Sequence, residues 1–282
     1  MKYRLFDEIE RKDTGPEPES EAEYEYINRS ARPDAQKIRS LLEDWFSRYP
    51  EKQNDFLRRF KSNKDKEHDS AFFELYTHEI LIRQGFTCRV HPEIEGSSTR
   101  PEFLASYKEL NFYSYVEATI PDLPQDDAIN PGAAMIRRAI HKKASAYGNL
   151  GKPYLIAINV NNVRPFIRDS HVADALFGDL RLVTNPKTEE HPYRRDLRTA
   201  TLIALGGTPE HTRVSGIIIL KNLGPWSITQ ITPVLWHNAW AKHPFPPELW
   251  QLPQQIPKEV YEKKEGKAVS ELLGLPRHWP ED

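Results

Sequence analysis

RPEFLASYKELNFYSYVEAT, residues 100–119, is the stretch that decides the fold. Its apolar and aromatic residues predict two strands, residues 102–107 and 112–120, which a short polar loop joins into a hairpin. Glu102 begins the first strand, and Glu117 lies near the end of the second. A carboxylate in such apolar surroundings needs a partner, a metal ion or a proton. We therefore expect functional chemistry at this hairpin.

The alternation of side chains along the second strand divides its residues between two faces. Glu117, Tyr115 and Thr119 share one face, whereas Val116 and Ala118 point to the other. Glu117 can thus reach a cleft while its apolar neighbours enter the core.

The segments on either side of the hairpin predict the fold class. A helix at residues 71–84 is apolar around too much of its circumference for a surface helix, and a strand follows at residues 86–91. After the hairpin, a helix at residues 132–147 leads into a nearly continuous apolar strand at residues 154–160, which is typical of a central strand. Strand, helix and strand in this order predict a right-handed crossover between parallel strands. The predicted class is α/β, with a mixed central sheet flanked by helices.

Composition shifts divide the chain into four predicted regions. These are an acidic flexible arm (1–32), a helical N-terminal extension (33–68), an α/β domain (69–243) and a tail rich in proline and tryptophan that packs on the core (244–282). Within the α/β domain, a helix is predicted at residues 170–180, and residues 212–220 and 227–236 predict a late hairpin.

Length and composition exclude several classes of protein. A chain of 282 residues with 38% hydrophobic content can bury a sizeable core. A single cysteine, Cys88, excludes an internal disulfide and a cysteine-based zinc site. No apolar run is long enough to span a bilayer, so the expected location is the cytoplasm. The ten histidines show no ligand spacing, so we expect them to be surface or hydrogen-bonded residues.

Basic residues gather directly after the hairpin although the net charge is only -2. Residues 128–168 contain no acidic residue, and seven basic ones: Arg137, Arg138, Lys142, Lys143, Lys152, Arg164 and Arg168. Local potential attracts phosphates more than total charge does, so this basic island predicts a nucleic-acid partner. The candidate contacts are Arg137, Arg138, Lys142 and Lys152. The alternative is a solvated helix face with no role in binding.

The order of these features resembles the PD-(D/E)xK, or restriction-endonuclease-like, nuclease superfamily. The resemblance rests on Glu74 in the helix before the sheet, on PEFL at residues 101–104, and on VEAT at residues 116–119. It covers residues 70–160 and implies a restriction-endonuclease-like core, magnesium as cofactor with manganese as a substitute, and hydrolysis of nucleic acid, with DNA favoured.

Two positions depart from the pattern of that superfamily. Glu102 stands where the family has aspartate, and Thr119 stands at the lysine position. Some family members supply the lysine from the following helix, which here offers Lys142 and Lys143. Helical spacing favours Lys143, because it continues an apolar stripe that Lys142 leaves: Ile136, Ala139, Ile140, Lys143 and Tyr147.

The resemblance assigns a role to each of these side chains. It predicts Glu102 and Glu117 as ligands of the metal ion, Glu74 as a residue that orients a ligand, and Lys143 as the displaced lysine beside the scissile phosphate. Thr119 could assist only through its hydroxyl. The alternative hypothesis is a nuclease-like domain that no longer cleaves and acts as a nucleic-acid or protein interaction module, because the motif lysine is missing.

Overall fold

The structure is a computed structural model that describes residues 3–50, 54–122, 130–148, 150–161, 167–182, 193–203, 207–256 and 262–281. Arg164 of the basic island lies outside these ranges. All other candidate site residues lie within them.

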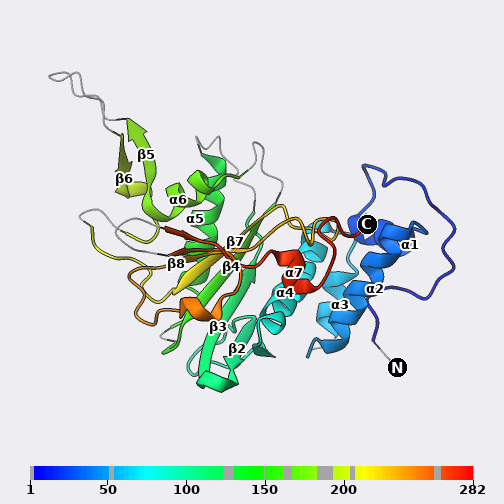
Figure 1. The fold of residues 1–282 in the computed structure, drawn as a ribbon, viewed down its shortest axis with the longest axis horizontal. Helices are drawn as coiled ribbons and strands as arrows, with labels where there is room; N and C mark the ends of the chain where they lie inside the picture. The colour runs from blue at the N-terminus through cyan, green and yellow to red at the C-terminus, as the bar shows by residue number, and fades with distance from the viewer. Residues whose placement is uncertain are drawn as a thin grey trace.

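A mixed sheet of eight strands forms the centre of the fold (Figure 1). In sheet order the strands are β1 (Thr87–Val90), β2 (Phe103–Tyr107), β3 (Phe112–Thr119), β4 (Tyr154–Val160), β7 (Gly216–Lys221), β8 (Val234–His237), β9 (Gln254–Ile256) and β10 (Glu262–Lys264). The β2–β3 hairpin is antiparallel, and β3, β4 and β7 run parallel. The predicted α/β class with a mixed central sheet is therefore confirmed, and so is the late hairpin, which β7 and β8 form.

Helices cover both faces of the sheet. On one face, α4 (Asp65–Arg83) packs against β1 and β3, and α1 (Glu23–Arg29), α2 (Pro33–Arg48) and α3 (Asn54–Phe60) pack around α4. On the other face, α5 (Pro131–Ala144) packs against β4 and α6 (Asp169–Phe177). The alternation predicted for β3 is observed, because Val116 joins the core on the α4 side and Tyr115 the core on the α5 side.

The helix α4 begins at Asp65, whereas the sequence predicted its start at residue 71. The charged residues before the apolar stripe are compatible with a helical first turn, where Asp65 and Glu67 interact favourably with the helix dipole.

Both ends of the chain are packed on the α4 side of the sheet. Leu5 and Phe6 are buried in that core, so the expectation of a flexible arm is wrong for this part of residues 1–32. The acidic composition of this region led to the prediction of flexibility, although two apolar residues suffice to pack it on the core. In the tail, Trp250 and Trp279 join the same core, together with α7 (Val269–Leu273). Lys37 on α2 donates to the carbonyl of Pro280 at 2.9 Å.

A two-stranded ribbon projects from the body of the fold (Figure 1). Its strands are β5 (Asp179–Leu182) and β6 (Tyr193–Asp196), and short 3-10 turns complete the fold at Lys108–Leu110, Leu197–Thr199 and Pro247–Leu249. The helix expected at residues 170–180 ends at Phe177 because Gly178 has a φ of +94°. A Cβ at Gly178 would lie 2.3 Å from the Asp196 carbonyl oxygen, so only glycine allows this turn.

We predict that His78 makes the stability of the fold sensitive to acid. Its side chain is buried on α4 between the rings of Tyr49 and Phe103, and burial, together with the charge of Arg48, lowers its pKa to about 4. A histidine whose folded pKa lies below its unfolded value of about 6.5 loses its stabilising effect as the pH falls through that interval.

The wild-type free energy of unfolding should therefore fall, relative to that of His78→Leu, by on the order of 3 kcal/mol between pH 6.5 and pH 4. Urea unfolding at several pH values measures this difference. His278→Leu, which replaces an exposed histidine, is the control. Parallel pH curves for the wild type and His78→Leu would contradict the prediction.

Candidate metal site

Glu102 occupies the point where β1 and β2 begin to separate. It directly precedes β2, and its carbonyl accepts the backbone N–H of His91 at 2.9 Å, one pairing beyond the β1–β2 register. His91 has a φ of +45°, which is uncommon for a residue other than glycine and often marks a functional site. Because Phe103 pairs with Val116, the next position along the hairpin sets Glu102 opposite Glu117.

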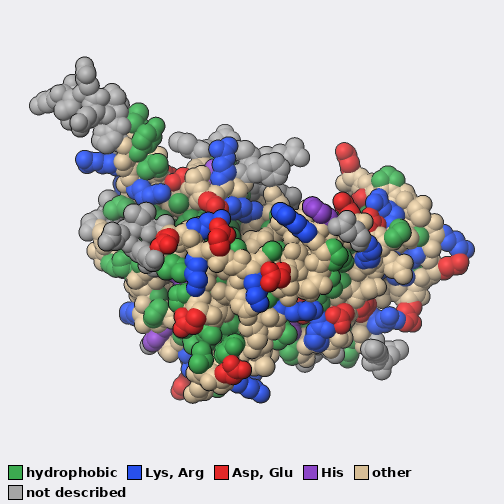
Figure 2. Space-filling model, in the orientation of Figure 1, with side chains coloured by type: hydrophobic (Ala, Val, Ile, Leu, Met, Phe, Trp, Pro, Cys, Tyr) green, Lys and Arg blue, Asp and Glu red, His purple; other side chains and the backbone are tan. Residues whose placement is uncertain are grey.

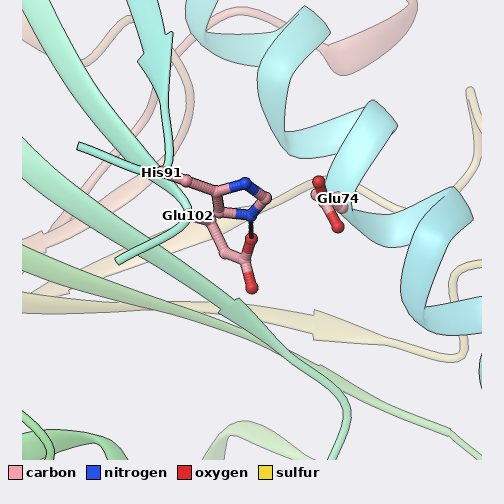
Figure 3. A group of neighbouring side chains, drawn as sticks. All are labelled: Glu74, His91 and Glu102. Carbon is pink, nitrogen blue, oxygen red and sulfur yellow. Dashed lines mark hydrogen bonds and ion pairs between the residues drawn. The ribbon is translucent and has the colours of Figure 1, made fainter. Parts of the chain in front are cut away.

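Glu74, His91 and Glu102 form a cluster that could hold a metal ion. One ligand atom from each residue lies within 4.8 Å of the others. Figure 3 shows the His91 imidazole in contact with the Glu102 carboxylate, with Glu74 beside them on α4. The Nε2 of His91 is 3.0 Å from Oε2 of Glu102. Small side-chain movements would bring the three groups to the separations found around a bound divalent ion.

The Glu74 carboxylate is buried and held by two side chains from the N-terminal helices. The Tyr49 hydroxyl donates to its Oε1, and Arg59 donates to its Oε2 at 2.8 Å. Burial and repulsion from Glu102 raise the pKa of Glu74 to about 7, although Arg59 and Tyr49 act in the opposite direction. Glu74 therefore carries a proton for part of the time near neutral pH, and a bound cation would displace it.

Glu117 is held from the other face of the sheet. Its carboxylate is buried, with Oε1 paired with the Lys143 ammonium and Oε2 accepting the Tyr147 hydroxyl at 2.7 Å. Burial raises the pKa of Glu117, Lys143 opposes this rise, and repulsion from Glu102 adds to it. The structure thus places Lys143 against the hairpin, whereas Lys142 is exposed, as the helical stripe predicts.

Glu102 links these two groups of side chains. Its charge acts on Glu74 and Arg59 on the α4 side, and on Glu117 and Tyr147 on the α5 side. One half-buried carboxylate therefore interacts with the polar residues of both faces at a single edge of the hairpin.

The composition of the cluster differs from the predicted metal ligands. Glu117 was expected to share the ion with Glu102, but the residues brought within ligand distance are Glu74, His91 and Glu102. The reason is the ion pair with Lys143 and the hydrogen bond from Tyr147, which occupy the Glu117 carboxylate. His91 was missed because histidines were judged by spacing along the chain. The sequence signal for His91 is its position at the end of the predicted strand 86–91, which pairs with the strand that Glu102 begins.

The basic island separates into structural and exposed residues. Arg137 pairs with Asp179 at 2.5 Å and donates to the Asp174 carbonyl, so it joins α5 to β5, and its predicted contact with nucleic acid stays a prediction. Arg138 and Lys142 are exposed and line a cavity of about 280 Å³ with Thr119, and Lys152 is half-buried before β4. On the face that Figure 2 shows, acidic and basic side chains are interspersed.

Comparison with protein families, with curated proteins and with solved structures finds no significant match. Function therefore has to be inferred from the side chains and their geometry. Among the described residues, no helix combines the length and the apolar character needed to cross a membrane.

We predict that a divalent ion binds this cluster more tightly as the pH rises. The raised pKa of Glu74, about 7, means that binding at pH 6 must displace a proton that is largely gone at pH 8. The affinity for Mn²⁺ should increase on the order of tenfold over this interval. Calorimetric titration at the two pH values measures it.

Two variants test where the ion binds. Glu102→Gln should abolish binding, because it removes a charged ligand from the cluster. Glu109→Gln, on the exposed turn of the same hairpin, should leave binding unchanged. Equal affinities for the wild type and Glu102→Gln would place any bound ion elsewhere.

Proposed function

We propose that the chain is a metal-dependent nuclease that hydrolyses phosphodiester bonds in nucleic acid, with DNA as the favoured substrate. The observation that carries this proposal is the position of Glu102 between Glu74 and His91 on one side and Glu117 and Lys143 on the other. The order α4, β1, β2, β3, α5 and β4 also agrees with the resemblance to the PD-(D/E)xK superfamily.

The donor set of the cluster fits a divalent cation. Two carboxylates suit Mg²⁺ or Mn²⁺, and the imidazole of His91 suits Mn²⁺ better than Mg²⁺. When bound, such an ion neutralises charge on a phosphate oxygen and favours deprotonation of water. Arg59 would then hold Glu74 in place as a ligand rather than act as its only counter-charge.

The side chains around Glu117 supply the remaining chemistry. The Lys143 ammonium lies beside Glu117, where it can stabilise the negative charge that builds up on a phosphate in the transition state. Burial raises the pKa of Glu117, which makes its carboxylate a stronger base for a proton of the attacking water. Tyr147 fixes the second carboxylate oxygen through a hydrogen bond. Its own pKa is raised by burial and by Glu117, so the hydroxyl stays a donor.

A second candidate function is binding without cleavage. In that case Arg59 and Lys143 neutralise the carboxylates of Glu74 and Glu117, and no metal ion binds. Thr119 would then mark the loss of the lysine that the motif needs for cleavage. The chain would then act as a nucleic-acid or protein interaction module. Metal binding separates the two functions, because only the nuclease needs an ion at the cluster.

Cleavage assays with plasmid and single-stranded DNA test the proposal. The wild type should nick DNA with Mn²⁺ or Mg²⁺ and lose this activity in chelator. Glu117→Gln and Lys143→Met should each lower the rate at least a hundredfold, since each removes a group that transfers a proton or stabilises charge. Lys108→Met, at the exposed tip of the hairpin, is the control for loss of a lysine. Nicking that survives in Glu117→Gln would overturn the proposal.

Neighbouring arginines on α5 provide a matched test of nucleic-acid binding. Arg138→Met should reduce the slope of log K against log salt concentration by about 0.9, the value for one lost phosphate contact. Arg137→Met should instead lower the melting temperature, because Arg137 is paired with Asp179. Filter binding across salt concentrations and thermal unfolding measure the two effects. An unchanged slope in Arg138→Met would favour a solvated helix face.

A further inference from the structure

A cavity of about 410 Å³ lies between the N-terminal segment and α2, on the far side of α2 from the sheet core. It is independent of the candidate site and shares no residue with it. Three arginines and three acidic residues line it: Arg4, Asp7, Glu8, Arg11, Arg39 and Glu43. Which of these six side chains already has an ion pair or hydrogen bond decides what the cavity can bind.

Arg39 is buried, and no carboxylate of the described residues pairs with it. Its side chain is on α2 and the residue is only 9% exposed, yet it lines the cavity. Its Nη1 donates to the carbonyls of Ile27 and Ser30, the latter at 2.8 Å. Within the described chain no partner is recorded for Nε or Nη2, the edge of the guanidinium that binds oxyanions in bidentate fashion.

Arg11 also uses backbone carbonyls in place of a carboxylate. It donates to the carbonyls of Asn28 at 2.5 Å, Ile9 at 3.1 Å and Asp7 at 2.6 Å. Burial and the charge of Arg11 lower the pKa of Arg39 to about 10, so the two guanidinium groups lie close enough to repel each other.

Each acidic residue of the cavity has a partner other than Arg39. Asp7 pairs with Lys61 at 2.8 Å and also accepts from the side chain of Asn28. Glu8 pairs with Arg4, and Glu43 accepts the backbone N–H of Phe6 at 2.9 Å. Among the described residues, no carboxylate forms an ion pair with Arg39, which is unfavourable for a buried charge, and the Asp7 carboxylate acts on Arg11 only through its charge.

We propose that this cavity binds a phosphate monoester through the free edge of Arg39, with Arg11 supplying the second positive charge. A phosphate monoester carries close to two negative charges at neutral pH and thus balances both guanidinium groups, whereas a single carboxylate balances one. The group could come from a free mononucleotide or from the 5′-phosphate at the end of a nucleic acid. Both present the same tetrahedral oxyanion.

Calorimetry on the full chain in chelator tests this proposal without engaging the metal cluster. Inorganic phosphate and adenosine monophosphate are the small phosphate ligands. A 5′-phosphorylated oligonucleotide carries the same group at the end of a strand, and the 5′-hydroxyl oligonucleotide lacks it. We expect saturable binding of at least one phosphate-bearing probe and a higher melting temperature in its presence. Preference for adenosine monophosphate assigns a free nucleotide, and preference for the phosphorylated over the hydroxyl oligonucleotide assigns a strand end.

Two substitutions of Arg39 keep the test decisive. Arg39→Met should abolish binding, but loss of its carbonyl contacts could prevent folding. Arg39→Lys keeps the positive charge and removes the bidentate edge, so it should fold and weaken binding at least tenfold. Arg58→Met, an exposed arginine on α3, is the control. Equal affinity in Arg39→Lys, tighter binding of succinate than of phosphate, or no saturable binding at millimolar phosphate would overturn the proposal.

Discussion

Repulsion among three carboxylates is the constraint on which the candidate site depends. Burial and repulsion from Glu102 raise the pKa of both Glu74 and Glu117, and all three carboxylates are at least half-buried, where charge is poorly solvated. Each of the two outer carboxylates has a cation beside it, Arg59 on one face of the sheet and Lys143 on the other. Among the described residues, the Glu102 carboxylate is paired with the imidazole of His91 alone. The site is therefore short of positive charge at its centre, where a divalent ion would be most stabilising.

This constraint makes the N-terminal helices part of the site. Tyr49 ends α2 and Arg59 belongs to α3, so both side chains that hold Glu74 lie outside the α/β domain expected to start at residue 69. Packing of aromatic rings fixes their positions, because Tyr49 and Phe56 lie 4.7 Å apart between ring centroids. The α/β core without these helices would leave a buried carboxylate without its donors.

The sequence predicts those parts of the fold that periodicity controls. Alternation in β3 places Val116 and Tyr115 on opposite faces, and helical spacing selects Lys143 over Lys142, because both follow from repeats of two and 3.6 residues. Contacts between distant segments have no such period. The pairing of His91 with Glu102 depends on strand register, and the reach of Arg59 to Glu74 depends on how two helices pack. The ion pair of Arg137 could not be predicted for the same reason, since Asp179 lies far along the chain.

The helix α2 connects the two ends of the chain to the interior of the fold. Lys37, in its second turn, bonds the carbonyl of Pro280, and the residue that ends it, Tyr49, donates to Glu74. Leu5 and Phe6 pack in the same core as α2. Removing Leu5 and Phe6, or Pro280, therefore removes contacts that hold α2 in place, and the other end of α2 contacts the carboxylate cluster through Tyr49. The surroundings of Glu74 therefore depend on segments far from it along the chain, although the carboxylate itself lies on a single helix.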